Sequence, residues 1–169
     1  RINSFIKIGN NKPIQLIIIT INALLQKNVP FKDFPKSVWD IKESSKIILS
    51  DFSKNIIDSG YRRSGTVMDI GEFAIRGGIV DVFSPNYSYP LRIDFFGDEV
   101  ESIKFFDPLT QISIKSTNNI KILPISEVLL NEININLFKM NYRKLFGINA
   151  SQDELFQLIS QGERPVGLE

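Results

Sequence analysis

Between Arg62 and Leu123, short runs in which apolar and polar residues alternate are separated by turn residues. Glycine and proline supply most of the separators, because glycine tolerates a positive φ and proline fixes φ. The connections are too short to hold the crossover helices that parallel neighbours require, so we expect mostly antiparallel pairing. The expected strands are Arg62–Met68, Glu72–Arg76, Ile79–Phe83, Leu91–Phe95, Val100–Phe106, Ile112–Thr117 and Ile120–Leu123.

Helical patterns flank this strand-rich segment. Before it, Ser45–Leu49 predicts a short strand, and Ser50 is placed to cap a helix that ends at Gly60 and buries Phe52 and Ile56. After Pro124, apolar residues recur at helical spacing up to Gly147, and Ser151–Glu154 has the form of a capping box that opens a last helix. We interpret the apolar faces of both later helices as core. They carry Ile135, Phe138, Tyr142, Leu145 and Phe146, then Leu155, Phe156 and Ile159.

The first part of the chain predicts a different environment. The β-branched run Ile14–Ile19 is typical of a strand buried on both faces, as in a parallel sheet, and Thr20 is placed to cap the helix that follows. One strand and one helix cannot form a sheet alone. Pro30 and Pro35 then indicate a connector, and we expect Trp39 to pack at the junction.

These patterns together predict an α/β fold made of two parts. Residues 38–123 are expected to form an inserted, mostly antiparallel α+β module between two pieces of an α/β domain, residues 1–37 and the helical residues 124–169. No signal peptide is visible, and the longest apolar run is too short to span a membrane. We interpret the chain as an excerpt from a longer protein.

Composition excludes several kinds of catalytic site. The chain has no cysteine and no histidine, which removes thiol nucleophiles, Ser–His–Asp triads and thiolate or imidazole metal sites. Neither a phosphate-binding loop of the Walker A type nor a dinucleotide-binding glycine pattern is present. The formal net charge of +1 does not favour direct nucleic-acid binding. We therefore expect no catalysis, no cofactor and no metal in this chain.

The strand around Leu91–Phe96 carries the main functional signal. Alternation places Leu91, Ile93 and Phe95 on one face, and Arg92, Asp94 and Phe96 on the other. Arg76 also falls on the polar side of its strand. An outward phenylalanine beside arginines is typical of a protein interface.

An alternative on the residues alone is that Phe96 packs into the turn at Gly97–Asp98 while the arginines pair with Asp94 or Glu99. This alternative is the more frequent arrangement, because single exposed apolar residues are common. Phe105 and Phe106 raise a related question, since one of two adjacent strand aromatics must point away from the core, and the sequence does not say which.

Several long motifs stand out in the chain: GYR at 60–62, GEFAIRGGIVDVF at 71–83, PLRIDFFGDEVESI at 90–103, FDPLTQ at 106–111 and LP at 123–124. These motifs resemble one family, the amino-terminal UvrB-like region of bacterial transcription-repair coupling factors (Mfd). The resemblance covers essentially the whole chain, including the segment IQLIIITINALLQKNVP before the module. UvrB itself carries a related module, with GTFRVRGD in place of the GEFAIRGG found here.

This resemblance implies a UvrB-like α/β domain whose insert recruits UvrA, the damage-recognition subunit of nucleotide excision repair. The positions that match the family's UvrA contacts are Arg76, Arg92 and Phe96, which alternation also places outward. Asp94 shares their face and completes the candidate partner-binding set. The agreement favours an interface over the alternative given above.

The resemblance also implies properties of a full-length protein. That protein would be a cytoplasmic ATP-dependent DNA translocase that uses ATP and Mg²⁺, binds RNA polymerase and double-stranded DNA, and does not enter a membrane. A carboxy-terminal domain would mask the UvrA site. Two other interpretations stay open here: a fragment of the excision nuclease subunit UvrB, and a DNA-binding or helicase-accessory module.

Overall fold

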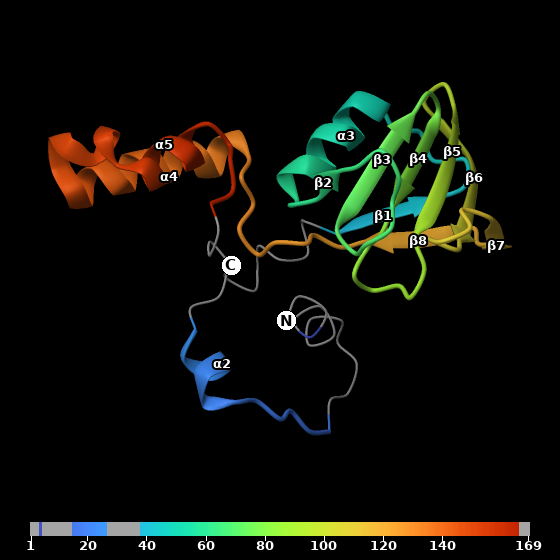
Figure 1. Cartoon of the computed structure of the whole chain (residues 1–169), viewed down its shortest axis with the longest axis horizontal. Coiled ribbons are helices and arrows are strands. Elements are labelled where there is room, and N and C mark those ends of the chain that lie inside the picture. The colour runs from blue at the N-terminus through green and yellow to red at the C-terminus, as the bar shows by residue number, and fades with distance from the viewer. Residues whose placement is uncertain (1–3, 5–14, 27–37, 166–169) are drawn as a thin grey trace.

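The computed structural model describes residues 4, 15–26 and 38–165 and shows helices together with two β-sheets (Figure 1). This confirms the mixed α/β class expected from the sequence. In chain order the elements are α2 (Ile21–Leu25), β1 (Trp39–Lys42), α3 (Leu49–Asp58), β2 (Arg62–Arg63), β3 (Glu72–Arg76), β4 (Ile79–Val82), β5 (Leu91–Phe96), β6 (Glu99–Phe106), β7 (Ser113–Ser116), β8 (Asn119–Ile122), α4 (Glu132–Phe146), the 3₁₀ helix η3 (Gly147–Gln152) and α5 (Glu154–Ser160).

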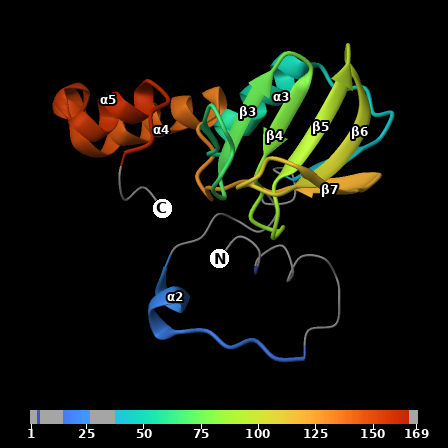
Figure 2. The same cartoon turned by 45° about the vertical axis from the view of Figure 1, so that its right-hand side comes forward.

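Strands β2 to β7 form a six-stranded sheet in chain order, and β1 pairs with β8 in a separate two-stranded sheet. Every pair is antiparallel except β2 with β3. Figure 2 shows strands β3 to β6 side by side with α3 behind them. The expected antiparallel pairing is confirmed, because turns of two residues connect β3 to β4 and β5 to β6.

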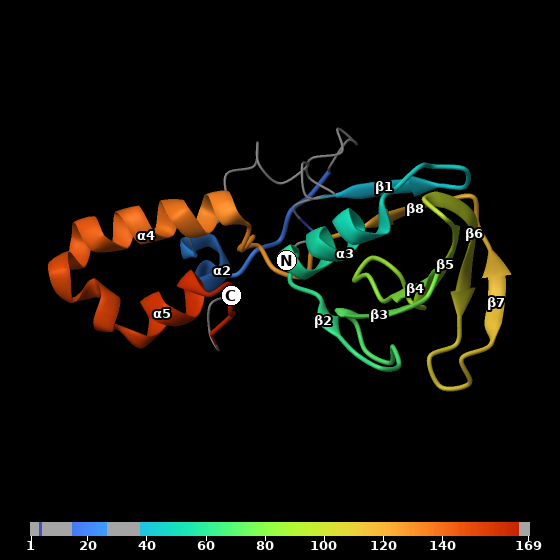
Figure 3. The ribbon, with the colours of Figure 1, turned by 90° about the horizontal axis from the view of Figure 1, so that it is seen from above.

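The main hydrophobic core lies between α3 and the two sheets, as the view from above shows (Figure 3). Phe52 and Ile56 of α3 are buried there, as their helical spacing predicts. Trp39 is half-buried, and its ring meets that of Phe52 edge-on with 5.4 Å between centroids. Trp39 therefore packs against this core. The fully buried side chains of the core also include Ile41, Phe73, Val80, Val82, Leu91, Ile93, Ile103 and Ile120.

The start of α3 differs from the prediction. Ser45–Leu49 forms no strand, and only an isolated bridge joins Lys46 to Glu99. The backbone at Ser44–Ile47 instead bonds to Asp98 and Val100 beside the β5–β6 turn. The helix consequently begins at Leu49 with Ile48 as its N-cap, so the predicted cap at Ser50 is wrong. Gly60 ends the helix with a φ of +95°, as predicted.

Two further boundaries in the β module differ from the sequence pattern. The strand expected over Arg62–Met68 stops at Arg63, because the carboxylate of Glu72 accepts bonds from the main-chain N–H groups of Met68 and Asp69 and holds that segment as a loop. Strand β1 was not expected, since the region before it was interpreted as a connector. The prolines of that connector lie outside the described residues.

The predicted strand over Ile14–Ile19 is wrong for the residues that the structure describes. Residues 15–20 form neither helix nor strand and are exposed, and Ile14 lies outside the described part. A strand buried on both faces needs partners on either side, and the described residues provide none for it. Thr20 does cap α2 by accepting a bond from the N–H of Ala23 at 3.3 Å, as predicted.

Helices α4 and α5 lie side by side, away from the sheets in Figures 1 and 3. Phe138 and Tyr142 of α4 pack against Phe156 of α5, with ring centroids 6.0 and 5.5 Å apart. Leu145, Phe146 and Leu155 were expected in a core but are exposed. Helix α4 has 15 residues and α5 only 7, so the end of α4 is left uncovered, and only Phe156 and Ile159 of α5 are buried.

The N-cap of α5 also differs from the prediction. The cap is Asp153, whose Oδ1 accepts from the N–H of Phe156 at 3.2 Å, so the predicted cap at Ser151 is wrong. Ser151 belongs to the preceding 3₁₀ helix. The short 3₁₀ turn carries the chain two residues further before α5 starts, which leaves Asp153 at the helix entry.

Gly78 of the β3–β4 turn lies where the backbone approaches β5 very closely. A Cβ at Gly78 would lie 2.6 Å from the carbonyl oxygen of Phe95, whose N–H bonds back to Gly78. We expect Gly78→Ala to lower the free energy of unfolding by about 1–3 kcal/mol, because the strands must separate. Gly65→Ala is the control, since a Cβ there meets nothing within 4 Å. Urea unfolding of both variants checks this, and equal stabilities would contradict it.

Candidate protein-docking surface

Side chains of the six-stranded sheet that point away from α3 form what we call the open face. On β5, Leu91, Ile93 and Phe95 are buried against the main core, whereas Arg92 and Asp94 are partly exposed and Phe96 is 81% exposed. The alternation predicted for this strand is therefore confirmed, and Phe96 does not pack into the neighbouring turn. Its role in binding a partner stays a prediction.

The strand register brings the candidate residues of different strands together. Arg76 pairs with Ile79 across the β3–β4 turn, and Ile79 pairs with Asp94 of β5. Phe96 follows Asp94 by two residues on the same face. Ile79, which sequence reasoning did not single out, is 38% exposed and adds an apolar surface between Arg76 and Asp94. Ile79 alternates with the core residues Val80 and Val82, and this alternation was the signal that the sequence offered for an outward side chain.

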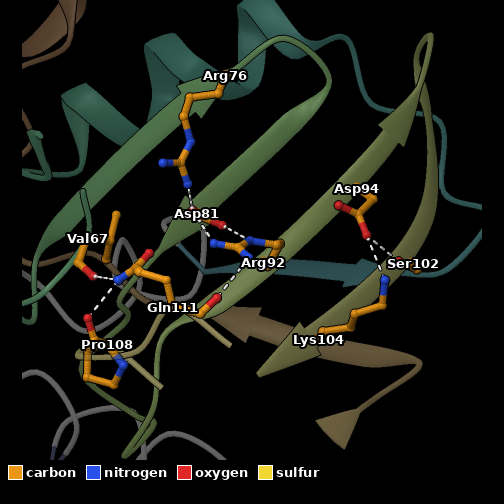
Figure 4. A network of polar contacts seen from close by, with 9 residues as sticks. All are labelled: Val67, Arg76, Asp81, Arg92, Asp94, Ser102, Lys104, Pro108 and Gln111. Atoms are coloured by element: carbon orange, nitrogen blue, oxygen red, sulfur yellow. Dashed lines mark hydrogen bonds and ion pairs between the residues drawn. The ribbon is translucent and has the colours of Figure 1, made fainter. Parts of the chain in front are cut away.

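Asp81 of β4 is the polar centre of the open face, and sequence reasoning missed it as well. Its side chain is fully buried, and it accepts from Arg92 through Nε to Oδ1 at 2.7 Å and Nη2 to Oδ2 at 2.9 Å. Arg76 donates through Nη2 to the same Oδ2. Figure 4 shows both guanidinium groups meeting this carboxylate. The alternative in which the arginines pair with Asp94 or Glu99 is thus wrong.

This arrangement stabilises the charged form of Arg92. The hydrogen bonds to Asp81 raise the pKa of Arg92 above its ordinary value, although partial burial works in the opposite direction. Register explains the contact, because Asp81 and Arg92 are direct cross-strand neighbours. A buried carboxylate without partners would be costly, so the two arginines also satisfy Asp81.

Asp94 has its own partners on β6. Its Oδ2 accepts from Ser102 Oγ at 2.6 Å and from Lys104 Nζ at 3.0 Å (Figure 4). Partial burial acts to raise the pKa of Asp94, but these bonds outweigh it and hold that pKa below its usual range. The negative charge of Asp94 is therefore balanced by Lys104 within the sheet.

The two adjacent phenylalanines of β6 point to opposite faces, and both are at least partly covered. Phe105 is half-buried on the α3 side, where its ring meets that of Tyr87 at 5.3 Å. Phe106 is fully buried on the other side in a small cluster with Val67, Ala74 and Phe83. The guanidinium carbon of Arg92 lies 4.6 Å from the centre of the Phe106 ring, within range of a cation–π contact.

The chemistry of the open face fits contact with another macromolecule. Among the four candidate residues, Phe96 and Arg76 are the most exposed, with 48% of the Arg76 side chain accessible, whereas the Arg92 side chain is only 20% accessible. Exposed aromatic rings and arginines are enriched at protein interfaces. Within residues 4, 15–26 and 38–165, no three acidic side chains gather in a way that could hold a metal ion, and no helix is long and apolar enough to cross a membrane.

Comparison with known proteins also indicates a protein-interaction domain. The sequence model of the family described as UvrB interaction domain matches residues 39–128. A transcription-repair-coupling factor of Rickettsia bellii (strain RML369-C) is 37% identical over 169 residues, which is all of this chain and 15% of that protein.

Similar proteins occur in other bacteria. The transcription-repair-coupling factor of Escherichia coli (strain K12) is 29% identical over 154 residues, or 91% of this chain and 13% of its own length. That of Myxococcus xanthus is 30% identical over 132 residues, or 78% of this chain and 11% of its own length. The chain thus spans about a seventh or less of the length of these relatives.

The buried carboxylate of Asp81 generates a stability prediction. Asp81→Asn keeps the size of the side chain but leaves two guanidinium groups without their shared anion. We expect the free energy of unfolding to fall by about 1–3 kcal/mol, the usual range when a buried polar group loses its partner. Urea unfolding measures this loss.

Asp94→Asn is the matched control for this substitution, because Asp94 lies on the same face but is partly open to water. It should cost clearly less than Asp81→Asn. A smaller loss for Asp81→Asn than for Asp94→Asn would contradict the central place given to Asp81.

Proposed function

Because the chain belongs to the UvrB interaction domain family and corresponds to part of the transcription-repair coupling factors, we propose that it docks UvrA during transcription-coupled nucleotide excision repair. In this role it brings the damage-recognition subunit to a coupling factor at stalled RNA polymerase. The chain itself contributes binding and no catalysis.

The exposed ring of Phe96, on the same face of the sheet as the Arg76–Asp81–Arg92 group, is the observation that carries this proposal. Phe96 leaves 81% of its surface exposed, so its ring contributes little to the core and is available to a partner. Arg76 adds hydrogen-bond donors on the same face, and Ile79 adds apolar area. Aromatic and arginine anchors of this kind dominate the affinity of many interfaces.

We propose a domain organisation that places this surface on an insert. Residues 38–123 would form the docking module, and residues 1–37 and 124–169 would belong to the UvrB-like α/β domain on either side. The family match over residues 39–128 supports the module. Exposed apolar side chains outside it support the second part, because they need cover. They include Leu16, Ile18, Ile133 and Leu137.

The remaining roles concern the whole protein. We propose an ATP-dependent, Mg²⁺-requiring DNA translocase in the cytoplasm that binds RNA polymerase and double-stranded DNA, and in which a carboxy-terminal domain covers the UvrA site. The support is the similarity to transcription-repair-coupling factors, of which this chain represents a small part.

Direct DNA binding by the open face has less support. Its basic residues are paired with acids on the same sheet, as in Arg62 with Glu72 and Lys104 with Asp94. The formal net charge of +1 also provides little attraction for a phosphate backbone.

Alanine substitutions on the open face test the proposed docking. We expect Arg92→Ala and Phe96→Ala each to weaken UvrA binding by about thirty-fold, or roughly 2 kcal/mol, since truncating an interface anchor usually costs this much. Arg76→Ala should weaken binding in the same direction. Isothermal titration calorimetry with UvrA measures the effect.

Phe146→Ala is the matched control for Phe96→Ala, and Arg63→Ala is the matched control for Arg92→Ala. Both side chains are exposed, and Phe146 lies on α4 whereas Arg63 lies on the edge strand β2. They should bind UvrA like the parent chain. Unchanged affinity for both Arg92→Ala and Phe96→Ala would refute the proposed docking surface.

A further inference from the structure

The turn that follows β6, at Asp107–Gln111, lies against the open face but has no part in the function proposed so far. Oδ1 of Asp107 accepts from the N–H groups of Leu109 and Thr110 at 2.9 and 2.8 Å, and the N–H of Gln111 bonds to the carbonyl of Asp107 at 2.8 Å. Gln111 closes the turn with a φ of +60°, which is uncommon for a residue other than glycine. The turn is therefore well defined by its own contacts.

The Gln111 side chain ties this turn to a second loop. Its Nε2 donates to the carbonyl of Pro108 at 2.7 Å and to the carbonyl of Val67 at 3.3 Å. Val67 belongs to the loop before β3 and is fully buried in the small cluster beneath the turn. Gln111 thus joins two loops that are 44 residues apart in the chain. Figure 4 shows the amide between Val67 and Pro108.

The main chain of Gln111 reaches Arg92. Its carbonyl oxygen accepts from Arg92 Nη1 at 3.2 Å, while Nε and Nη2 of the same guanidinium bond to Asp81. The guanidinium carbon of Arg92 also lies over the Phe106 ring. Among the described residues, Arg92 therefore uses three of the five N–H groups of an arginine, and two are left to meet a partner.

We infer that Gln111 is a positioning residue for Arg92. Asp81 alone could hold one edge of the guanidinium, but a long arginine side chain keeps considerable rotamer freedom unless other contacts restrict it. The turn supplies the second edge contact, and the Gln111 amide fixes the turn. This inference rests on the docking function proposed above, and it explains how a partner would meet Arg92 in one orientation without an ordering cost.

Gln111→Ala tests this directly, because alanine and glutamine face the same cost at a positive φ and differ in the amide. We expect UvrA to bind Gln111→Ala about fivefold more weakly than the parent chain, although Gln111 itself need not touch UvrA. In the Arg92→Ala background, the same substitution should have no further effect. Isothermal titration calorimetry of the four chains completes this double-mutant cycle.

Gln157→Ala is the matched control. The Gln157 amide also donates to a main-chain carbonyl, that of Ser151 at 3.1 Å, but it lies on α5. This variant should bind UvrA like the parent chain. Circular dichroism and thermal unfolding check that every variant keeps its fold.

A second measurement does not depend on the partner. In the ¹⁵N NMR spectrum of the free chain, the Arg92 Nη1–H signals, whose group donates to the Gln111 carbonyl, should be protected from exchange with water, and Gln111→Ala should remove much of that protection. A turn with a merely structural role would leave these signals unchanged.

The outcomes separate the two proposals. Loss of affinity for Gln111→Ala only when Arg92 is present, together with loss of Nη1–H protection, supports the inference. Weaker binding by Arg92→Ala with parent-like binding and protection for Gln111→Ala overturns the inference and leaves the docking function intact. Equal losses in both backgrounds also overturn it. Parent-like binding by Arg92→Ala and Phe96→Ala removes the docking function itself, and the positioning role with it.

Discussion

The open face depends on one buried carboxylate that two arginines share. Asp81 has no exposed side-chain surface, so its charge would be strongly unfavourable without close partners. Arg92 satisfies it from the neighbouring strand in a two-point contact, and Arg76 reaches it from the other side. The pairing that stabilises Asp81 also places both guanidinium groups on the side of the sheet that α3 leaves uncovered. Stability and the presentation of a binding surface thus rest on the same contact.

The two faces of the six-stranded sheet have different roles. The side that faces α3 buries a continuous hydrophobic core, which keeps the strands in register. The open face carries paired charges, a small second cluster around Phe106, and the exposed ring of Phe96. A rigid sheet can present such a ring with little loss of entropy on binding. This division of tasks suits the docking function proposed for the chain.

Local periodicity predicted much of this fold, and contacts between distant residues account for the rest. The alternation on β5 could be read directly, since one face of that strand is buried and the other is not. The partner of Arg92 could not, because the sequence suggested acids nearby in the chain, whereas strand register places Asp81 opposite Arg92. Ile14–Ile19 shows the same limit, since an apolar run forms a strand only where neighbours pair with it. The binding roles of Arg76, Arg92, Asp94 and Phe96 remain predictions.

Hydroxyl-radical footprinting of the chain, alone and with saturating UvrA, tests the central claim most directly. Phe96 and Phe146 are both exposed in the free chain, the first on the open face and the second at the end of α4, so each should be oxidised. If the open face docks UvrA, oxidation of Phe96 should fall sharply in the complex while oxidation of Phe146 stays the same. Undiminished oxidation of Phe96 in a saturated complex would contradict the account.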